Sequence, residues 1–372
     1  MTRQTVVVLG GYGVFGTRIA QSLVRHSQLD IVVAGRNGDA ARAFAATCSS
    51  QSVRALRADC TRADDLAQLL ALRPAVLIDT VGPFQARDYT VARRCAASGI
   101  HYIDIADGRE HVSGIRALDG VAREQGALIV SGASTVPAVS TAVVDSLEPD
   151  PAAVVVVEAG ISPGHRGPRG LATAQSILRY CGQPIPCVTG DGMESGWGGL
   201  VRHAYPVPVG RRWLSNVDVP ERASWKARYP NLASAAVQAG LEISFLHLGL
   251  SVLSRLVRIG LVRSLLPCAS AFLRVATLCN RFGTDDGAMH VTVMSKDSSE
   301  TTTRRTWTLI AEHGDGPQIP ATPAALIAKK LLALPDYAPI TVRGALPCLG
   351  LVTIDEILRE LRGLAIRVSV TG

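Results

Sequence analysis

A glycine-rich turn that directly follows a buried strand constrains the fold of this chain more than any other feature. Residues 5–9 are a continuous apolar, β-branched run, which is typical of a parallel strand buried on both faces. The turn Gly11-Tyr12-Gly13-Val14-Phe15-Gly16 comes next and opens a stretch with apolar residues at helical spacing. A G-x-G-x-x-G turn between a strand and a helix predicts a dinucleotide-binding β-α-β unit.

Further strands and helices alternate after this turn. Short apolar runs predict strands, and the segments between them have helical spacing or are rich in alanine. The expected strands are 31–34, 53–58, 75–80, 102–105 and 127–130, and the expected helices are 17–26, 39–47, 63–72, 87–98 and 112–125. Six strands alternating with helices predict an α/β fold with an N-terminal Rossmann domain, which is a doubly wound parallel sheet. The linker candidate Pro149-Asp150-Pro151 places this domain at residues 1–149.

The pattern changes after the linker. A strand is expected at 154–161, followed by a loop rich in glycine, proline and arginine at 162–170. Two further segments, 289–294 and 305–311, resemble strands of an antiparallel sheet, and helices are expected at 324–334 and 354–361. We therefore expect a second, α+β domain over residues 150–372, with a mixed or antiparallel sheet. Whether its C-terminal helices pack back on the Rossmann domain stays open.

The composition of the chain indicates which classes of binding partner we expect. The chain has 372 residues, 47% of them hydrophobic and 19% charged, with a net charge of +7 that comes mostly from arginine. Basic residues do not cluster with aromatic ones, so we expect no nucleic-acid partner. The eight cysteines include no C-x-x-C pair, which favours reduced thiols, a cytoplasmic location and no metal site. The first strand begins within five residues of the N-terminus, so we expect no signal peptide.

Residues at the ends of the strands indicate which dinucleotide binds. The diphosphate would rest on the backbone of the glycine-rich turn and on the N-terminus of the first helix. Arg36 and Asn37 end the second strand, where an acidic residue would select NAD, and a guanidinium there favours the 2′-phosphate of NADP(H). Asp59 ends the third strand and either accepts from the adenine amino group or caps the following helix. The loop Gly82-Pro83-Phe84 ends the fourth strand on the nicotinamide side, unless it only shapes a rigid turn.

Titratable groups gather after the fifth strand. Tyr102, Asp107 and His111 are the candidates for proton transfer, because they lie at the crevice edge of the expected sheet. Alternation places Tyr102 and Asp104 on one face of the strand. Asp107 has a second interpretation as a helix cap. In the loop 162–170, the side chains of His165, Arg166 and Arg169 either hold a substrate carboxylate or are merely solvated.

The segment 241–278 is strongly apolar but is interrupted by four arginines. Its longest uncharged stretch, 243–254, is too short to span a bilayer by itself. One hypothesis is a buried helix pair or a dimer interface. A second is an interfacial helix whose apolar face enters a membrane while arginines contact the headgroups. A third is a membrane span.

Five segments together resemble the saccharopine dehydrogenase-like oxidoreductase family: GGYGVFG, AGRN, DTVGPF, HYIDIADGREHV and GASTVPAVS. The resemblance covers residues 5–145 well and the rest more loosely. It implies an NADP-binding Rossmann domain and an α+β domain that supplies substrate contacts and a dimer surface. It maps the glycines and Arg36 onto the cofactor site and residues 82–84 onto the nicotinamide-side loop. The Lys/His acid–base pair of lysine-forming members is not visible, because the first lysine is Lys226.

Two hypotheses for function follow. In the first, the chain is an NADP(H)-dependent oxidoreductase that moves hydride to or from a C=N (imine) or C=C bond of a small or acyl, lipid-like substrate. It would be a homodimer and would contact a membrane peripherally through 241–278. In the second, it binds NADP without catalysis, as a redox sensor or a membrane-associated scaffold.

Overall fold

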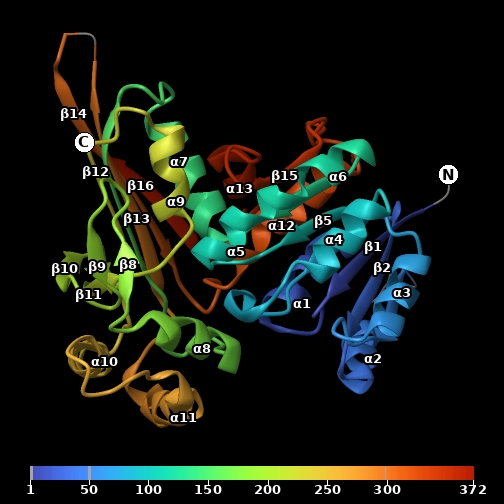
Figure 1. The fold of residues 1–372 in the computed structure, drawn as a ribbon, viewed down its shortest axis with the longest axis horizontal. Helices are drawn as coiled ribbons and strands as arrows, with labels where there is room; N and C mark the ends of the chain where they lie inside the picture. Colours follow the sequence, from blue (N-terminus) through green and yellow to red (C-terminus); the bar gives the residue numbers. More distant parts are fainter. Residues whose placement is uncertain (1–2, 49–51, 298) are drawn as a thin grey trace. The chain divides into compact units, whose positions relative to one another are not determined.

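The computed structural model describes residues 3–48, 52–297 and 299–372 (Figure 1). The chain forms two compact units, Met1–Val139 with Gln318–Glu360, and Ser140–Pro317 with Leu361–Gly372. The sequence placed a boundary between residues 149 and 150, whereas the structure divides before helix α7 (Ser140–Leu147). A segment near the C-terminus returns to the first unit.

The first unit contains a seven-stranded sheet in the order β15-β6-β5-β4-β1-β2-β3. All its neighbouring strands are parallel, as expected of a doubly wound Rossmann sheet. The strands are β1 (Gln4–Leu9), β2 (Leu29–Gly35), β3 (Val53–Arg57), β4 (Val76–Asp79), β5 (His101–Asp104), β6 (Leu128–Ser131) and β15 (Gly344–Pro347). The strand order reverses between β1 and β4, which is where such sheets bind ligands at the carboxyl ends of their strands.

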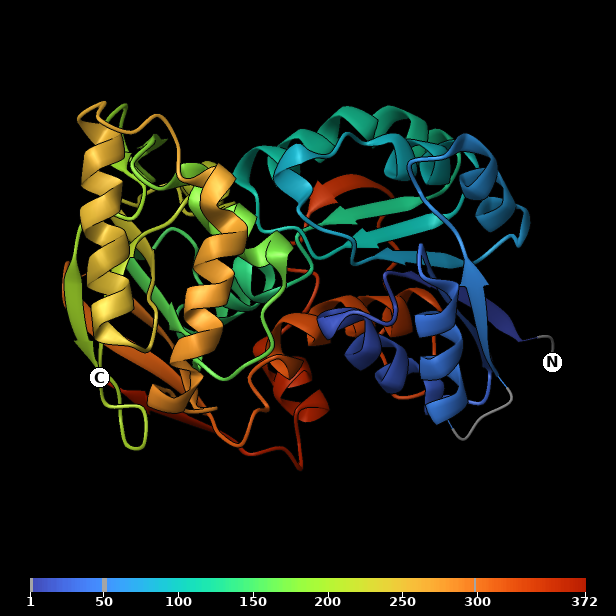
Figure 2. The same ribbon diagram turned by 90° about the horizontal axis from the view of Figure 1, so that it is seen from below.

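Helices flank this sheet, and Figure 2 shows the same ribbon from below. They are α1 (Val14–Val24), α2 (Gly38–Thr47), α3 (Ala63–Ala71), α4 (Thr90–Ala97), α5 (Arg109–Gly114), α6 (Asp119–Glu124), α12 (Gln318–Leu331) and α13 (Ile354–Glu360). Short 3-10 turns lie at Phe84–Ala86 and Ile115–Leu118, and a π-helical turn at Thr135–Val139. The helix expected over 112–125 is wrong, since α5, a 3-10 turn and α6 replace it. Gly114 and Gly120 lie in this stretch, and glycine is a poor helix former.

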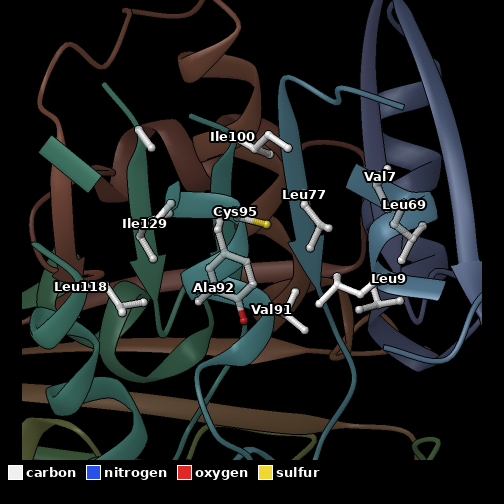
Figure 3. Close-up of a cluster of buried hydrophobic side chains, with 14 of the residues drawn as sticks. Val7, Leu9, Leu69, Leu77, Val91, Ala92, Cys95, Ile100, Leu118 and Ile129 are labelled. Atoms are coloured by element: carbon white, nitrogen blue, oxygen red, sulfur yellow. The ribbon is translucent and has the colours of Figure 1, made fainter. Parts of the chain in front are cut away.

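The core of the first unit lies between one face of the sheet and the helices that cover it (Figure 3). Val7, Leu77 and Ile129 point from three strands toward helical residues such as Leu69 and Cys95, and all five are at most 1% exposed. Fully burying a side chain of this size stabilises a fold by about 1.5–3 kcal/mol. The continuous apolar runs in the sequence are therefore explained by strands that are buried on both faces.

The second unit contains a mixed seven-stranded sheet in the order β10-β11-β12-β7-β13-β14-β16. Only β12 and β7 pair in parallel, and the other neighbours in this order are antiparallel. The strands are β7 (Val154–Ser162), β10 (Val201–Ala204), β11 (Arg211–Asn216), β12 (Ser234–Ala239), β13 (Gly287–Lys296), β14 (Thr302–Ala311) and β16 (Ile366–Thr371), with a separate pair β8 (Pro184–Pro186) and β9 (Met193–Ser195). The expected second, mixed sheet is confirmed.

Besides α7, the helices of this unit are α8 (Leu171–Tyr180), α9 (Glu221–Arg228), α10 (Ser244–Arg258) and α11 (Ala269–Leu278). Short 3-10 turns precede and follow α11 at Leu266–Cys268 and Cys279–Phe282. The apolar segment 241–278 therefore folds into two separate helices. In the parts of the chain that the structure describes, no helix has the length and apolar character needed to cross a membrane.

Candidate functional site

Side chains would not fit at several glycines in and beside the glycine-rich turn, Gly10 and Gly16 among them. Gly10 has a φ of +78°, and a Cβ there would lie 2.6 Å from Oγ1 of Thr80. A Cβ on Gly16 would lie 2.3 Å from the carbonyl oxygen of Gly10. Helix α1 therefore starts directly against the turn, with Gly13 as an N-cap that supplies no side-chain acceptor. Because the first N–H groups of a helix lack partners within the helix, this end of α1 can receive an anion.

A pocket of about 500 Å³ opens beside this turn, where β2 and β3 end. Its lining is Tyr12, Arg36, Asn37, Gly38, Asp39, Arg42 and Arg57. The hydroxyl of Tyr12 accepts a hydrogen bond from the backbone N–H of Asn37 at 3.0 Å. The Asn37 side chain in turn accepts from the N–H of Ala40 and caps α2. The structure thus brings together Tyr12, Arg36 and Asn37 of the residues predicted for the cofactor.

The pocket carries a net positive charge. Its one acidic residue, Asp39, pairs with Arg42 at 2.5 Å. In the described part of the chain, the guanidiniums of Arg36 and Arg57 have no carboxylate within ion-pair distance, and both are exposed. Arg57 was missed by the sequence analysis, although its position at the end of the third strand was a signal that could have found it.

Asp59 does not line this pocket. Its carboxylate accepts hydrogen bonds from the backbone N–H and the hydroxyl of Thr61, at 3.1 and 2.8 Å, and these bonds lower the pKa of Asp59. The N-cap of α3 is Arg62, without a side-chain cap. The interpretation of Asp59 as the cap of that helix is therefore wrong, and its contact with adenine stays a prediction.

The loop after β4 is held by a buried ion pair. Arg87 donates to Asp79 at 2.8 Å and to the carbonyl of Val81 at 2.7 Å, and Asp79 is fully buried. Burial raises the pKa of Asp79, and the nearby guanidinium opposes that rise. In the sequence, residues 82–84 lie between Asp79 and Arg87. The ion pair therefore closes their loop at the carboxyl end of the sheet. The Phe84 ring also contacts the Arg87 guanidinium, at 5.5 Å.

The three predicted proton-transfer residues have different surroundings. Tyr102 is 3% exposed and belongs to the core, and burial raises its pKa well above the usual value, so its hydroxyl keeps the proton. Asp107 is exposed and accepts a hydrogen bond from Gln85 at 2.9 Å. It does not cap α5, whose N-cap is Gly108 without a side-chain bond. His111 is buried, with its ring against those of Phe84 and Tyr89.

His111 faces a carboxylate that the sequence analysis did not select. Its Nε2 lies 3.5 Å from Oδ2 of Asp104, and neither atom has a hydrogen bond in the described structure. The other oxygen of Asp104 accepts from Ser131 Oγ, Gly132 N and Ala106 N, at 2.8 to 3.0 Å. These bonds fix the carboxylate at the carboxyl end of β5. The pair is therefore a buried carboxylate–imidazole arrangement that can hold or move a proton.

The loop 162–170 of the second unit is more than a solvated turn. The ring of His165 contacts the carbonyl of Ala276 through Nε2 at 2.8 Å and Nη1 of Arg169 through Nδ1 at 2.8 Å. Arg169 also donates to Oδ1 of Asn280 at 2.6 Å. Arg166 is exposed. His165 and Arg169 border an apolar pocket of about 100 Å³ between α8, α10 and α11.

In the part of the chain that the structure describes, no three His, Cys, Asp or Glu side chains are grouped so that they could hold a metal ion.

Residues 6–130 match the family model of the saccharopine dehydrogenase NADP binding domain. The expected resemblance is therefore confirmed, and this part of the chain is a nicotinamide-dinucleotide-binding domain. No curated protein matches the sequence.

Several solved structures are similar to this chain, and the first one described below shares its fold. Apo saccharopine dehydrogenase (L-Glu forming) from Saccharomyces cerevisiae matches with a TM-score of 0.65 and 14% identity, over 99% of this chain and 100% of that chain. A mutant meso-dapdh from Clostridium tetani matches with a TM-score of 0.47 and 11% identity, over 97% and 99% of the two chains. An amine dehydrogenase from Mycobacterium smegmatis gives a TM-score of 0.43 and 12% identity, over 94% and 95%.

Proposed function

We propose that this chain, whose residues 6–130 belong to the saccharopine dehydrogenase NADP binding domain family, is an NADP(H)-dependent oxidoreductase. Its substrate would carry a C=N or C=C bond and would be a small or acyl, lipid-like molecule. The family of the nucleotide-binding domain supports the oxidoreductase class, and the fold shared with saccharopine dehydrogenase agrees with it. The choice of NADP and of the bond reduced goes beyond both comparisons.

The charge of the pocket beside the glycine-rich turn carries the proposal for NADP. In a Rossmann domain this position receives the adenosine ribose, and the 2′-phosphate distinguishes NADP from NAD. Arg36 and Arg57 offer two guanidiniums without a carboxylate partner in the described structure, whereas Asp39 is already paired with Arg42. A doubly charged phosphate would find bidentate donors here, and a bare ribose would leave both cations uncompensated.

The residues at the carboxyl end of the sheet suit the proton that accompanies hydride transfer. Bound NADP(H) would supply or accept the hydride at C4 of its nicotinamide. His111 would deliver or take up the proton, because its buried ring faces the Asp104 carboxylate, with Nε2 held 3.5 Å from Oδ2. Tyr102 is less suited, since its hydroxyl is buried beside Asp79. Asp107 is accessible and stays a second candidate.

The cofactor proposal is tested by Arg36→Asp. We expect the variant to lose at least tenfold in NADPH affinity while NADH affinity changes little, because the new carboxylate repels the 2′-phosphate. Arg54→Asp is the matched control, because Arg54 is also exposed but lies outside the pocket. Unchanged NADPH binding in the Arg36 variant would contradict the assignment.

Turnover separates an enzyme from a cofactor-binding sensor or scaffold. NADPH oxidation is followed with a panel of cyclic imines and enoyl thioesters, and we expect substrate-dependent turnover with at least one of them. His111→Asn should lower kcat by about 10²-fold or more while leaving NADPH affinity unchanged. NADPH binding without turnover on any panel member would favour the non-catalytic alternative.

A further inference from the structure

Helices α10 and α11 and the turns beside them expose an unusual number of large apolar side chains. Eight of these residues, which we call the α10–α11 patch, are Phe245, Leu248, Val252, Ile259, Leu261, Val275, Leu278 and Phe282. Leu278 is 78% exposed and Phe245 is 56% exposed. The rings of Phe245 and Phe282 pack edge to face at 6.2 Å, so the start of α10 lies beside the end of α11 (Figures 1 and 2).

Helix α10 has apolar side chains on its outer face, where a helix in water would have polar ones. Its buried face holds polar side chains as well as Leu250 and Val257. Its buried face includes His247, Ser251 and Ser254, whereas its outer face begins with Phe245, Leu248 and Val252. The inward polar groups are satisfied by hydrogen bonds. His247 Nε2 lies 3.0 Å from Ser215 Oγ, and Ser254 donates to the carbonyl of Gly196 at 2.9 Å. Because the inner face is already complete, the outer apolar stripe does not contribute to the core of its own unit.

The charges on the chain segment that forms the patch have a single sign, although Glu242, Asp285 and Asp286 border this segment. Residues 243–284 contain five arginines and neither aspartate nor glutamate. The arginines are Arg255, Arg258, Arg263, Arg274 and Arg281, and all five are exposed. None of them has a carboxylate within ion-pair distance in the described structure, so their charges are uncompensated.

This charge pattern discriminates between the possible occupants. If a second copy of the chain covered the patch by a twofold contact, arginines would meet arginines with no acid from residues 243–284 to offset them, and like charges across an interface are costly. An anionic lipid surface supplies both an apolar layer for the side chains and phosphate groups for the guanidiniums. We propose that the α10–α11 patch docks this protein on the surface of an anionic membrane. The proposal does not depend on the proposed reaction.

The pocket beneath the patch fits a lipid environment. Its lining comes mainly from apolar residues of the same helices, among them Leu246, Leu250, Phe272 and Leu273. Arg169 borders the pocket, and burial lowers the pKa of this guanidinium although Glu242 opposes that shift. Glu242 also pairs with Arg212, at 3.1 Å. A short apolar segment of a lipid could enter this pocket, with its polar end near the Arg169 guanidinium.

The experiment is co-sedimentation of the full chain with vesicles. One set contains phosphatidylcholine with about 30% phosphatidylglycerol, and the other contains phosphatidylcholine alone. We expect at least tenfold stronger binding to the anionic vesicles, weakened by salt. The variant Phe245→Ser/Leu248→Ser/Val252→Ser should lose at least tenfold in binding, and Arg255→Gln/Arg258→Gln should lose most of the preference for the anionic lipid. The change Met193→Ser/Val207→Ser is the matched control, since both residues are exposed apolar side chains outside the patch.

Each variant is checked by circular dichroism and NADPH titration, so that a folding defect is not mistaken for lost docking. Absence of vesicle binding by the unaltered protein would overturn the proposal. Binding that survives the triple serine variant would overturn it as well. If sedimentation equilibrium showed a dimer that the serine variant dissociates, and vesicles did not bind, the patch would be an interface between copies.

Discussion

The hydroxyl of Tyr12 accepts a hydrogen bond from the backbone N–H of Asn37 at 3.0 Å, which ties the glycine-rich turn after β1 to the turn after β2. The ring reaches this position only because residue 35 is glycine. A Cβ on Gly35 would lie 2.5 Å from Cε1 of Tyr12. The two turns that border the positively charged pocket therefore behave as one structural unit.

Removing the Tyr12 hydroxyl should loosen this unit slightly. We expect Tyr12→Phe to lower NADPH affinity by about two- to tenfold, since one hydrogen bond contributes about 0.5–1.5 kcal/mol. Gly35→Ala should cost more, because the new methyl group displaces the whole ring. Both are measured by NADPH fluorescence titration. Equal effects of the two changes would contradict the packing argument.

Arg42 and Arg57, which line the pocket together with Arg36, should contribute unequally to NADPH binding. Arg57 has no carboxylate partner in the described structure, whereas Arg42 is held by Asp39 at 2.5 Å. We expect Arg57→Gln to weaken NADPH binding by about tenfold and Arg42→Gln by less than threefold, with NADH binding unchanged in both. Calorimetric titration with each nucleotide measures the ratio. A larger loss in the Arg42 variant would reverse the assignment.

The fold of the first unit could be predicted because its signals are local. Buried parallel strands appear in the sequence as apolar runs. The glycine-rich turn after residues 5–9 is typical of dinucleotide-binding domains. By contrast, β15 (344–347) joins the same sheet beside β6, more than two hundred residues along the chain. A four-residue strand with such a distant partner leaves no local pattern. For the same reason the sequence left open whether the C-terminal helices join the first unit, to which Gln318–Glu360 belongs.

Candidate site residues were easier to select from the sequence when the proposed role depends on one residue than when it depends on two residues that lie close together only in the fold. Arg36 could be selected from the sequence because its predicted role depends only on its position after the second strand, and the structure places it in the lining of the pocket. Asp104 was placed on a strand face but not selected, because its meaning depends on His111 lying 3.5 Å away. Arg57 likewise gains its role from a pocket shared with Arg36. For 241–278 the sequence left open a buried helix pair and a helix with an outward apolar face, since periodicity does not say which side of a helix meets the core.

Gly16 should be much less tolerant of a methyl group than a glycine in an open helix. A Cβ at Gly16 meets the backbone carbonyl of Gly10 at 2.3 Å, and neither backbone segment can move without opening the turn. We expect Gly16→Ala to lower the free energy of unfolding by about 1–3 kcal/mol and to abolish NADPH binding. Gly120→Ala is the control, since nothing lies within 4 Å of its Cβ. That change should stabilise by about 0.5–1 kcal/mol, and urea unfolding compares the two.

Glu221 should make the stability of the second unit depend on pH. Its side chain is fully buried, and one oxygen accepts a hydrogen bond from Ser140 at 2.5 Å while the other has no partner in the described structure. Burial raises the pKa of Glu221 from 4.5 to about 7. Between these two values the folded chain binds more protons than the unfolded chain. The contribution of this group to stability is therefore most favourable at low pH and falls as the pH rises from about 4.5 through 7.

The variant Glu221→Gln isolates this contribution, because the amide keeps the shape and the acceptor for Ser140 but has no proton to lose. We expect the variant to resemble the unaltered protein at pH 5 and to be more stable at pH 8 by about 3 kcal/mol, given a pKa difference of roughly 2.5 units at 1.36 kcal/mol each. Urea unfolding at both pH values measures the difference, with Glu158→Gln as an exposed control in the same unit. If the two curves shifted by the same amount at pH 5 and pH 8, the carboxyl of Glu221 would not be the titrating group.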